Sequence, residues 1–474
     1  MRAVPRTEKR QNLACPAESG PASHADAACI GSSFSLSPGF SVCPPVVPFW
    51  IECFYSQPFT VLKCPLVSLR KELASSLCIV VNKVLIMEKG VLMFLRFTRL
   101  GIRLLVRSPL VIAVAALLVL SFSLPSLIPS DTDAFVLSGE FIKENHLDFL
   151  KESMEGGAYD TAPEYMQKTN QRQLELLEIT QGNDQEASLR AQAEIAQLDM
   201  EMYERGNLVG EYLPLKSNEV FLTTLAKLDH PAAYMQTTQE PALYRLAAAM
   251  HSVPVLLLLA PIFAVNFVLL KSVEASSLLR QFPLRFCDKI ICFIAVSCMV
   301  STLLVALALL FPAVISLVRN GVGDPLYPVV FIQGNLLVET TVAKVAVNGL
   351  ALYALNALCI SSFAAAVFML ARKAIPAVFA AVLLSLLPMV PQYFAETFPL
   401  RDLLWALPTT YFDVSAVVGF PSCLRYEDIL PVAGANAMTG CIVLLVCSAL
   451  FTAFAAGLAH AVGDRVRRGG GRHA

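Results

Sequence analysis

Long apolar runs alternate with short polar segments over most of this chain, and this alternation predicts membrane-spanning helices. Residues 246–270 and 290–318, for example, contain no Asp, Glu, Lys or Arg. A helix of this length can cross a hydrocarbon core about 30 Å thick. Applied along the chain, the same criterion predicts six spans, at residues 109–129, 246–270, 290–318, 342–371, 374–391 and 435–462. We therefore expect an all-α polytopic membrane protein in which residues 246–462 form spans two to six.

Residues 1–86 do not follow this pattern. They are rich in Pro, Ser and Cys, and they contain neither a signal peptide nor a run long enough to cross a membrane. Met87 is followed directly by a basic and apolar segment. We interpret Met87 as the true start, and residues 1–86 as disordered or as an artefact of an upstream start. A genuine disordered cytosolic tail is the alternative.

Four arginines give residues 87–108 a helical pattern. Arg96, Arg99, Arg103 and Arg107 are three, four and four positions apart, so on a helix they form one stripe, with apolar residues on the other sides. This arrangement predicts an amphipathic helix at the cytosolic membrane surface, with its arginines among the lipid headgroups. We call it the arginine helix. Simple flanking charge for the first span is the other interpretation.

Residues 130–245, which we call the head, lie between the first two spans and differ from the rest of the chain. They contain 21 Asp and Glu against 9 Lys and Arg. Residues 164–180 are rich in good helix formers, and Asp184 is placed to cap a second helix that runs to about Glu204. The apolar positions predict a hairpin of these helices: Leu174, Leu177, Leu189, Ile195, Leu198 and Met202. We expect a helical extracytoplasmic domain whose acidic surface either attracts cationic ligands or only keeps it soluble.

Composition and charge agree with a membrane protein. The chain is 56% hydrophobic and 15% charged, whereas soluble proteins are about 45–50% apolar and about 25% charged. Lys and Arg concentrate in the arginine helix, in residues 271–289, at Arg372 and Lys373, and in the tail 463–474. Because basic residues favour the cytosolic side, we expect both termini in the cytosol, the head outside, and the plasma membrane as the location.

The loop formed by residues 271–289 is the most distinctive of these basic segments. It is short, and the two charge-free runs hold it on either side. Leu278 and Leu279 lie in it among mostly polar neighbours. A loop of this kind is suited to a soluble partner that moves the membrane helices. Packing of the two leucines against the membrane surface is the alternative, because isolated exposed apolar residues are common.

The motifs of nucleotide binding and hydrolysis are absent from the sequence. It contains no G-x-x-x-x-G-K-[ST], no H-E-x-x-H and no G-x-S-x-G. Its 13 cysteines include no C-x-x-C pair. We expect neither an enzyme nor a bound cofactor or metal, and no nucleic-acid partner. Asn266, Asn348 and Asn356 are polar residues well inside spans, where they either line a transport path or hydrogen-bond between helices.

The six predicted spans, the arginine helix and the loop after span two together resemble a known family. The chain is similar to the permease subunits of type-two ATP-binding-cassette exporters, in the subgroup with a large outward domain between spans one and two. In that family the loop after span two is a coupling helix that binds a separate ATPase subunit. The resemblance implies coupling roles for Glu274, Leu278, Leu279 and Pro283, and we expect the charge of Arg280 to belong to the same contact face. The expected Gly of the family pattern is missing here. Residues 407–411, Leu-Pro-Thr-Thr-Tyr, resemble the family's outer re-entrant region.

The resemblance implies a transport permease without its own nucleotide site. Its partners would be a separate ATPase subunit, a second permease in a homodimer or heterodimer, and the lipid bilayer. A four-span permease of the macrolide-export or lipoprotein-release type is a rival, which the span count disfavours. A membrane sensor or anchor, with an acidic ligand-binding head and no transport, is a rival of another class.

Overall fold

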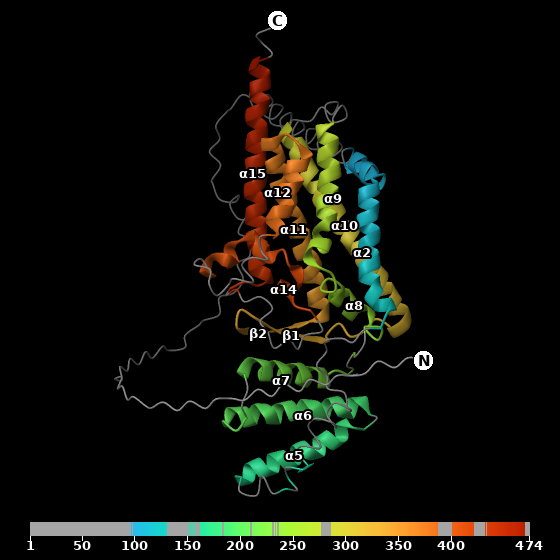
Figure 1. Ribbon diagram of the computed structural model, residues 1–474, viewed down its shortest axis with the longest axis vertical. Coiled ribbons are helices and arrows are strands. Elements are labelled where there is room, and N and C mark those ends of the chain that lie inside the picture. The colour runs from blue at the N-terminus through green and yellow to red at the C-terminus, as the bar shows by residue number, and fades with distance from the viewer. Residues whose placement is uncertain are drawn as a thin grey trace, which may run out of the picture. The chain divides into compact units, whose positions relative to one another are not determined.

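The computed structural model describes most of the chain from the arginine helix onward. The described residues are 96, 98–129, 151–152, 154, 156, 162–182, 184–208, 211–229, 232, 234, 237–275, 286–386, 401–420, 432 and 434–469. Residues 1–86, and with them the proposed start at Met87, lie outside this set. The described part is mostly helical, as expected (Figure 1).

Five of the described helices are long and apolar enough to cross a membrane, which indicates a membrane protein. They are α2 (Pro109–Leu127), α9 (Val255–Glu274), α10 (Phe286–Asn320), α11 (Val342–Ala371) and α15 (Ala437–Gly469). The predicted fifth span, residues 374–391, begins as α12 (Ala374–Leu386), which has 13 residues and is shorter than the others. Residues 387–391 lie outside the described part. The count of six spans therefore remains a prediction.

The predicted second span is divided in the structure. Residues 242–249 form a separate short helix, α8 (Ala242–Ala249), and α9 starts only at Val255. Pro254 explains the break, because proline has no N–H to donate and disfavours helical backbone in the residue before it. The expected border between head and span, at Arg245, therefore falls inside α8.

The apolar helices pack into one bundle around α11. This helix lies against α9, α10, α12 and α15, and α2 packs on α9 and α10. Several small residues of α11 are completely buried, among them Ala357 and Ala364. Small side chains allow two helix backbones to approach closely, which is a usual basis of helix association in membranes.

The head contains the predicted helical hairpin, and a further helix packs on it. The hairpin consists of α5 (Glu164–Thr180) and α6 (Gln185–Glu204), and α7 (Tyr212–Ala226) packs on α6. The Asp184 side chain accepts hydrogen bonds from the Glu186 and Ala187 N–H groups at 3.0 and 3.2 Å, which confirms the predicted cap. Of the six seam positions, three are buried and three half-buried: Leu177, Leu189 and Met202, then Leu174, Ile195 and Leu198.

A β-hairpin corrects the expectation of an all-α chain. β1 (Pro328–Gln333) pairs antiparallel with β2 (Leu336–Thr341) in a segment that we expected to be a loop. Gly334 and Asn335, with φ of 58° and 61°, form a two-residue turn whose twist matches the strands. All six residues of β1 are buried, and α7 of the head packs on this strand (Figure 1). The hairpin therefore connects the head to the helical bundle.

The segment before the last helix consists of short helices. It contains η2 (Arg401–Ala406), η3 (Pro408–Tyr411) and α14 (Val414–Val418), which pack against α15 and, for η3 and α14, α11. Of these helices, η3 and α14 are mostly buried. The Tyr411 hydroxyl donates to the Trp405 carbonyl at 2.6 Å. Gly440 of α15 leaves room for the Tyr411 ring, because an added Cβ would lie 2.5 Å from it.

Candidate functional site

Glu274 lies where the end of α9 meets the start of α12. Its Oε2 atom accepts a hydrogen bond from the Ala374 N–H at 3.2 Å and forms an ion pair with Lys271 Nζ at 3.4 Å. Ala374 is the first residue of α12, so the carboxylate lies at the positive end of that helix, where a negative charge is favourable. The structure thus gives Glu274 an intramolecular role as a cap of α12. This role had not been predicted.

The rest of the predicted coupling face is outside the described residues. This applies to Leu278, Leu279, Arg280 and Pro283, because the description stops at residue 275 and resumes at residue 286. The described ends are Ala275, the C-cap of α9, and Phe286, the first residue of α10, and these two helices pack against each other. The loop therefore joins two neighbouring helices, and Glu274 adds α12 to the same end of the bundle.

The described part of the arginine helix shows the predicted division between its faces. Arg96, Arg99, Arg103 and Arg107 are all exposed, whereas Thr98, Gly101 and Leu105 are buried. An added Cβ at Gly101 would lie 3.0 Å from Val296 of α10 and 3.7 Å from Leu269 of α9. The helix therefore packs closely against the same end of the bundle, with its arginines directed away from the protein.

We expect the arginine stripe to hold this helix at an anionic membrane surface. Each basic residue near such a surface contributes about 1 kcal/mol. The double variant Arg99→Glu, Arg103→Glu should show faster hydrogen exchange in residues 98–106 in nanodiscs that contain anionic lipid, and wild-type exchange in neutral lipid. A matched double reversal in the head, Arg190→Glu with Arg205→Glu, should leave that segment unchanged. If the wild type and the variant exchange at the same rate in anionic lipid, the stripe does not hold the helix at the membrane surface and acts only as a topology signal.

Asn266 is the centre of a closed set of hydrogen bonds between three helices. Its Nδ2 donates to Ser361 Oγ at 3.1 Å, and its Oδ1 accepts from Ser297 Oγ at 2.9 Å. Ser361 Oγ in turn donates to Ser297 Oγ at 3.0 Å. The three residues come from α9, α10 and α11 and are buried. This arrangement favours the interpretation of Asn266 as a link between helices.

The other two asparagines lie in different surroundings. Asn356 is fully buried on α11, and its Nδ2 donates to the Tyr411 carbonyl at 2.9 Å, which ties η3 to the bundle. Its Oδ1 has no hydrogen-bond partner among the described residues. Asn348 is exposed. The structure therefore does not bring the three together into one path.

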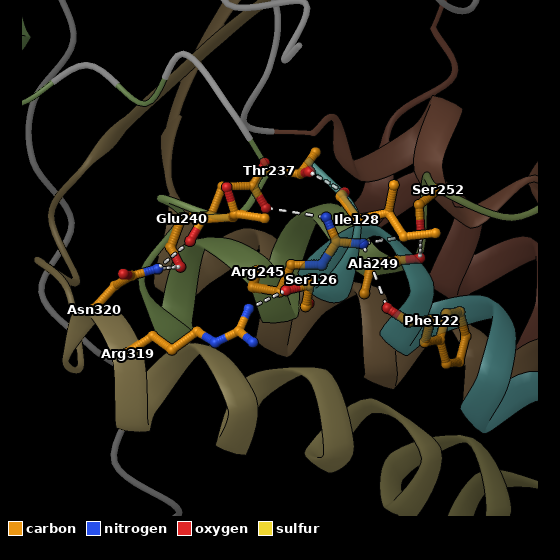
Figure 2. A network of polar contacts seen from close by, with 11 residues as sticks. Phe122, Ser126, Ile128, Thr237, Glu240, Arg245, Ala249, Ser252, Arg319 and Asn320 are labelled. Carbon is orange, nitrogen blue, oxygen red and sulfur yellow. Dashed lines mark hydrogen bonds and ion pairs between the residues drawn. The ribbon is translucent and has the colours of Figure 1, made fainter. Parts of the chain in front are cut away.

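A buried ion pair is the polar feature that the sequence analysis missed. Arg245 Nη1 lies 3.0 Å from Glu240 Oε2, and the two side chains are 2% and 3% exposed. Burial raises the pKa of the Glu240 carboxyl above its ordinary value, and the Arg245 guanidinium opposes this rise. Figure 2 shows the pair beside the ends of α2 and α10. One signal was present in the sequence, because Arg245 directly precedes a charge-free run and Glu240 is the nearest acidic residue.

A cluster of aromatic side chains includes Tyr244, the residue before Arg245 in α8. Tyr234, Tyr244 and Tyr327 contact one another with ring centroids 5.1–5.4 Å apart, and Phe221 of α7 meets Tyr327 at 6.3 Å. Burial raises the pKa of the Tyr327 hydroxyl well above its ordinary value. We call Glu240, Arg245 and their hydrogen-bond partners, together with this aromatic cluster and Arg319, which donates to the Ser126 carbonyl, the joint.

Comparison with protein families, curated proteins and solved structures finds no match for this chain.

Proposed function

We propose that this protein is the membrane-spanning permease subunit of an ATP-binding-cassette transporter that exports its substrate. The observation that carries the proposal is the convergence of α9, α10 and α12 at the loop 271–289. Glu274 ties the end of α9 to the first residue of α12, and α9 and α10 flank the loop on both sides. A partner bound to this loop would hold three helices of the bundle at once.

Two further features of the structure support the proposal of a permease. The arginine helix packs by Gly101 on this end of the bundle, with its arginines exposed. The short helices η3 and α14 before the last apolar helix are folded and mostly buried, and η3 lies in the segment 407–411 that resembles the family's re-entrant region. Both features are expected of such a permease and are not needed by a simple anchor.

In this proposal the chain does not hydrolyse ATP and needs no cofactor of its own. A separate ATPase subunit binds the loop through Leu278, Leu279, Arg280 and Pro283, and a second permease completes the transporter. The loop and both termini lie in the cytosol, at the plasma membrane, and the head lies outside.

Replacing Leu278 and Leu279 by Ser tests the proposal. Burial of one leucine in a partner groove contributes about 1.5–3 kcal/mol, so the loss of both would weaken ATPase binding by about two orders of magnitude or more. We expect normal amounts of the variant in the membrane, little ATPase in a pull-down, and no transport. The measurement is the ratio of ATPase to permease after affinity purification from the native membrane.

Leu326 and Leu336 provide a matched control, because they are exposed apolar residues in the part of the chain around the hairpin. Their double replacement by Ser introduces the same chemistry away from the loop and should leave the ATPase bound. Normal ATPase retention and transport in the Leu278→Ser, Leu279→Ser variant would refute the coupling role. A wild-type protein that never co-purifies with an ATPase would favour the sensor or anchor.

A further inference from the structure

The carbonyl end of α2 is held by side chains from outside that helix. Arg245 Nη2 donates to the Phe122 carbonyl at 3.5 Å, and Arg319 Nη1 donates to the Ser126 carbonyl at 2.8 Å. Thr237 Oγ1 donates to the Ile128 carbonyl at 3.3 Å. These donors come from α8, α10 and the segment before α8, and they surround the end of α2 in Figure 2. Cations are favourable at this end of a helix because its free carbonyls carry partial negative charge.

A proline separates this last turn from the rest of α2. Pro125 lies inside the helix and has no N–H, so it cannot donate the usual hydrogen bond to the Ser121 carbonyl. Proline is a common cause of bends within helices. Residues 126–128, which are the end of α2 and its C-cap Ile128, are therefore less tightly bound to the helix, and Arg319 and Thr237 supply contacts in compensation.

The joint also binds the end of α10 to the start of α8. Asn320 Nδ2 donates to the Thr238 and Glu240 carbonyls at 2.7 and 2.9 Å. The Ala242 and Leu243 N–H groups donate to the Gly321 and Val322 carbonyls. The buried Glu240–Arg245 pair thus lies between the ends of two long helices.

A continuous series of contacts leads from the joint into the head. Phe221 of α7 contacts Tyr327, which contacts Tyr244, and Tyr244 precedes Arg245 in α8. Phe221 and Tyr327 are both 4% exposed. A displacement of α7 would therefore reach Arg245, which binds the Phe122 carbonyl three residues before Pro125, through packed side chains.

Several polar atoms around the last turn of α2 are buried and unpaired within the described structure. They are Arg245 Nε, Ser123 Oγ and Ser126 Oγ. Buried polar groups are normally paired, and exceptions call for a physical explanation. If the turn after Pro125 moved, these atoms could form hydrogen bonds that they lack in this structure. These unpaired atoms lie beside the turn that the relay would move.

We infer that the joint is a conformational relay, in which Arg245, bound to Phe122 before the hinge at Pro125, and Arg319, bound to Ser126 after it, transmit movements of the head to the end of α2. The relay does not depend on the transport function proposed above, because it concerns only the link between α7 and α2. Under that function it would couple the state of the head to the first membrane helix.

Hydrogen exchange of the amides of residues 126–128, in the full-length protein in nanodiscs, tests the relay. Phe221→Ala removes the first contact on the side of the head and should accelerate exchange in this turn about tenfold, a factor usual for coupling between sites. Arg319→Gln should accelerate it as well, and because Arg319 is exposed this variant keeps its fold. In the Arg319→Gln background, Phe221→Ala should have a smaller effect than alone.

The matched control is Leu176→Ala, which truncates a buried residue of the head, 2% exposed, on α5 rather than on the contact path. It should leave residues 126–128 at the wild-type exchange rate. Wild-type exchange in both Phe221→Ala and Arg319→Gln would overturn the relay. Equal acceleration by Leu176→Ala would also overturn it, because the head would then be loosened as a whole. Phe221→Leu replaces Phe221→Ala if the larger truncation prevents folding.

Discussion

Replacing Arg245 by Met will lower the free energy of unfolding by about 3–5 kcal/mol, because the substitution leaves the buried Glu240 carboxylate without its partner. The measurement is the midpoint of thermal unfolding in detergent, followed by size-exclusion chromatography of the soluble fraction. The matched control is Arg190→Met. Arg190 pairs with Glu186 on the surface, with both side chains about half exposed, and such pairs contribute about 0–1 kcal/mol.

The pH dependence of the Arg245→Met variant gives a second measurement. In this variant no guanidinium opposes the effect of burial on Glu240. The pKa of its carboxyl in the folded state therefore rises above the value in the unfolded state. The folded variant then binds a proton more readily than the unfolded chain does, so the loss of stability should shrink as the pH falls through the folded-state pKa. Adding Glu240→Gln should recover part of the loss at neutral pH. A loss below about 1 kcal/mol at neutral pH would contradict the importance of the pair.

Replacing Gly419 by Ala should also be severely destabilising, for two separate reasons. Gly419 ends α14 with φ 77° and ψ 178°, a backbone conformation that is nearly restricted to glycine and that costs other residues about 1–3 kcal/mol. An added Cβ would lie 2.3 Å from the ring of Phe331 in β1, and overpacking of this kind typically costs about 1–3 kcal/mol more. We expect a large fall in the unfolding midpoint.

Gly206→Ala separates the two causes. Gly206 has a positive φ of 73°, but an added Cβ there would meet nothing within 4 Å. This variant should therefore show the cost of the backbone alone. If Gly419→Ala is no more destabilising than Gly206→Ala, then the contact with Phe331 does not constrain the structure.

Strong local patterns were sufficient to predict several elements. The bounds of α11, residues 342–371, agree with the apolar run, and those of α5, residues 164–180, agree with the run of helix formers. The hairpin β1–β2 was missed, although Gly334-Asn335 between two apolar runs is a turn signal. The reason is that the surrounding apolar helices led us to treat every short polar segment as a loop.

The site was less predictable, because its contacts join residues far apart in the chain. Glu274 was selected for a partner protein, yet its carboxylate binds the N–H of Ala374, 100 residues later. No local pattern indicates such a pairing. Arg245 was treated as the border of a span, since periodicity cannot tell a charge at a membrane surface from one buried in an ion pair. The exposed arginine stripe, by contrast, follows from helical spacing within one segment.

The hydrogen bonds of Asn266 have a consequence for how α10 can slide along its neighbours. Rotation by one residue would turn Ser297 about 100° away and break the set that also includes Ser361. The next side chain on the same face is Ser301, one turn along α10, which is also completely buried and whose Oγ is unpaired within the described structure. A hydroxyl would therefore face Asn266 again only after a step of a whole turn, about 5.4 Å. Small, continuous displacements of α10 are disfavoured, and its permitted positions form a discrete series.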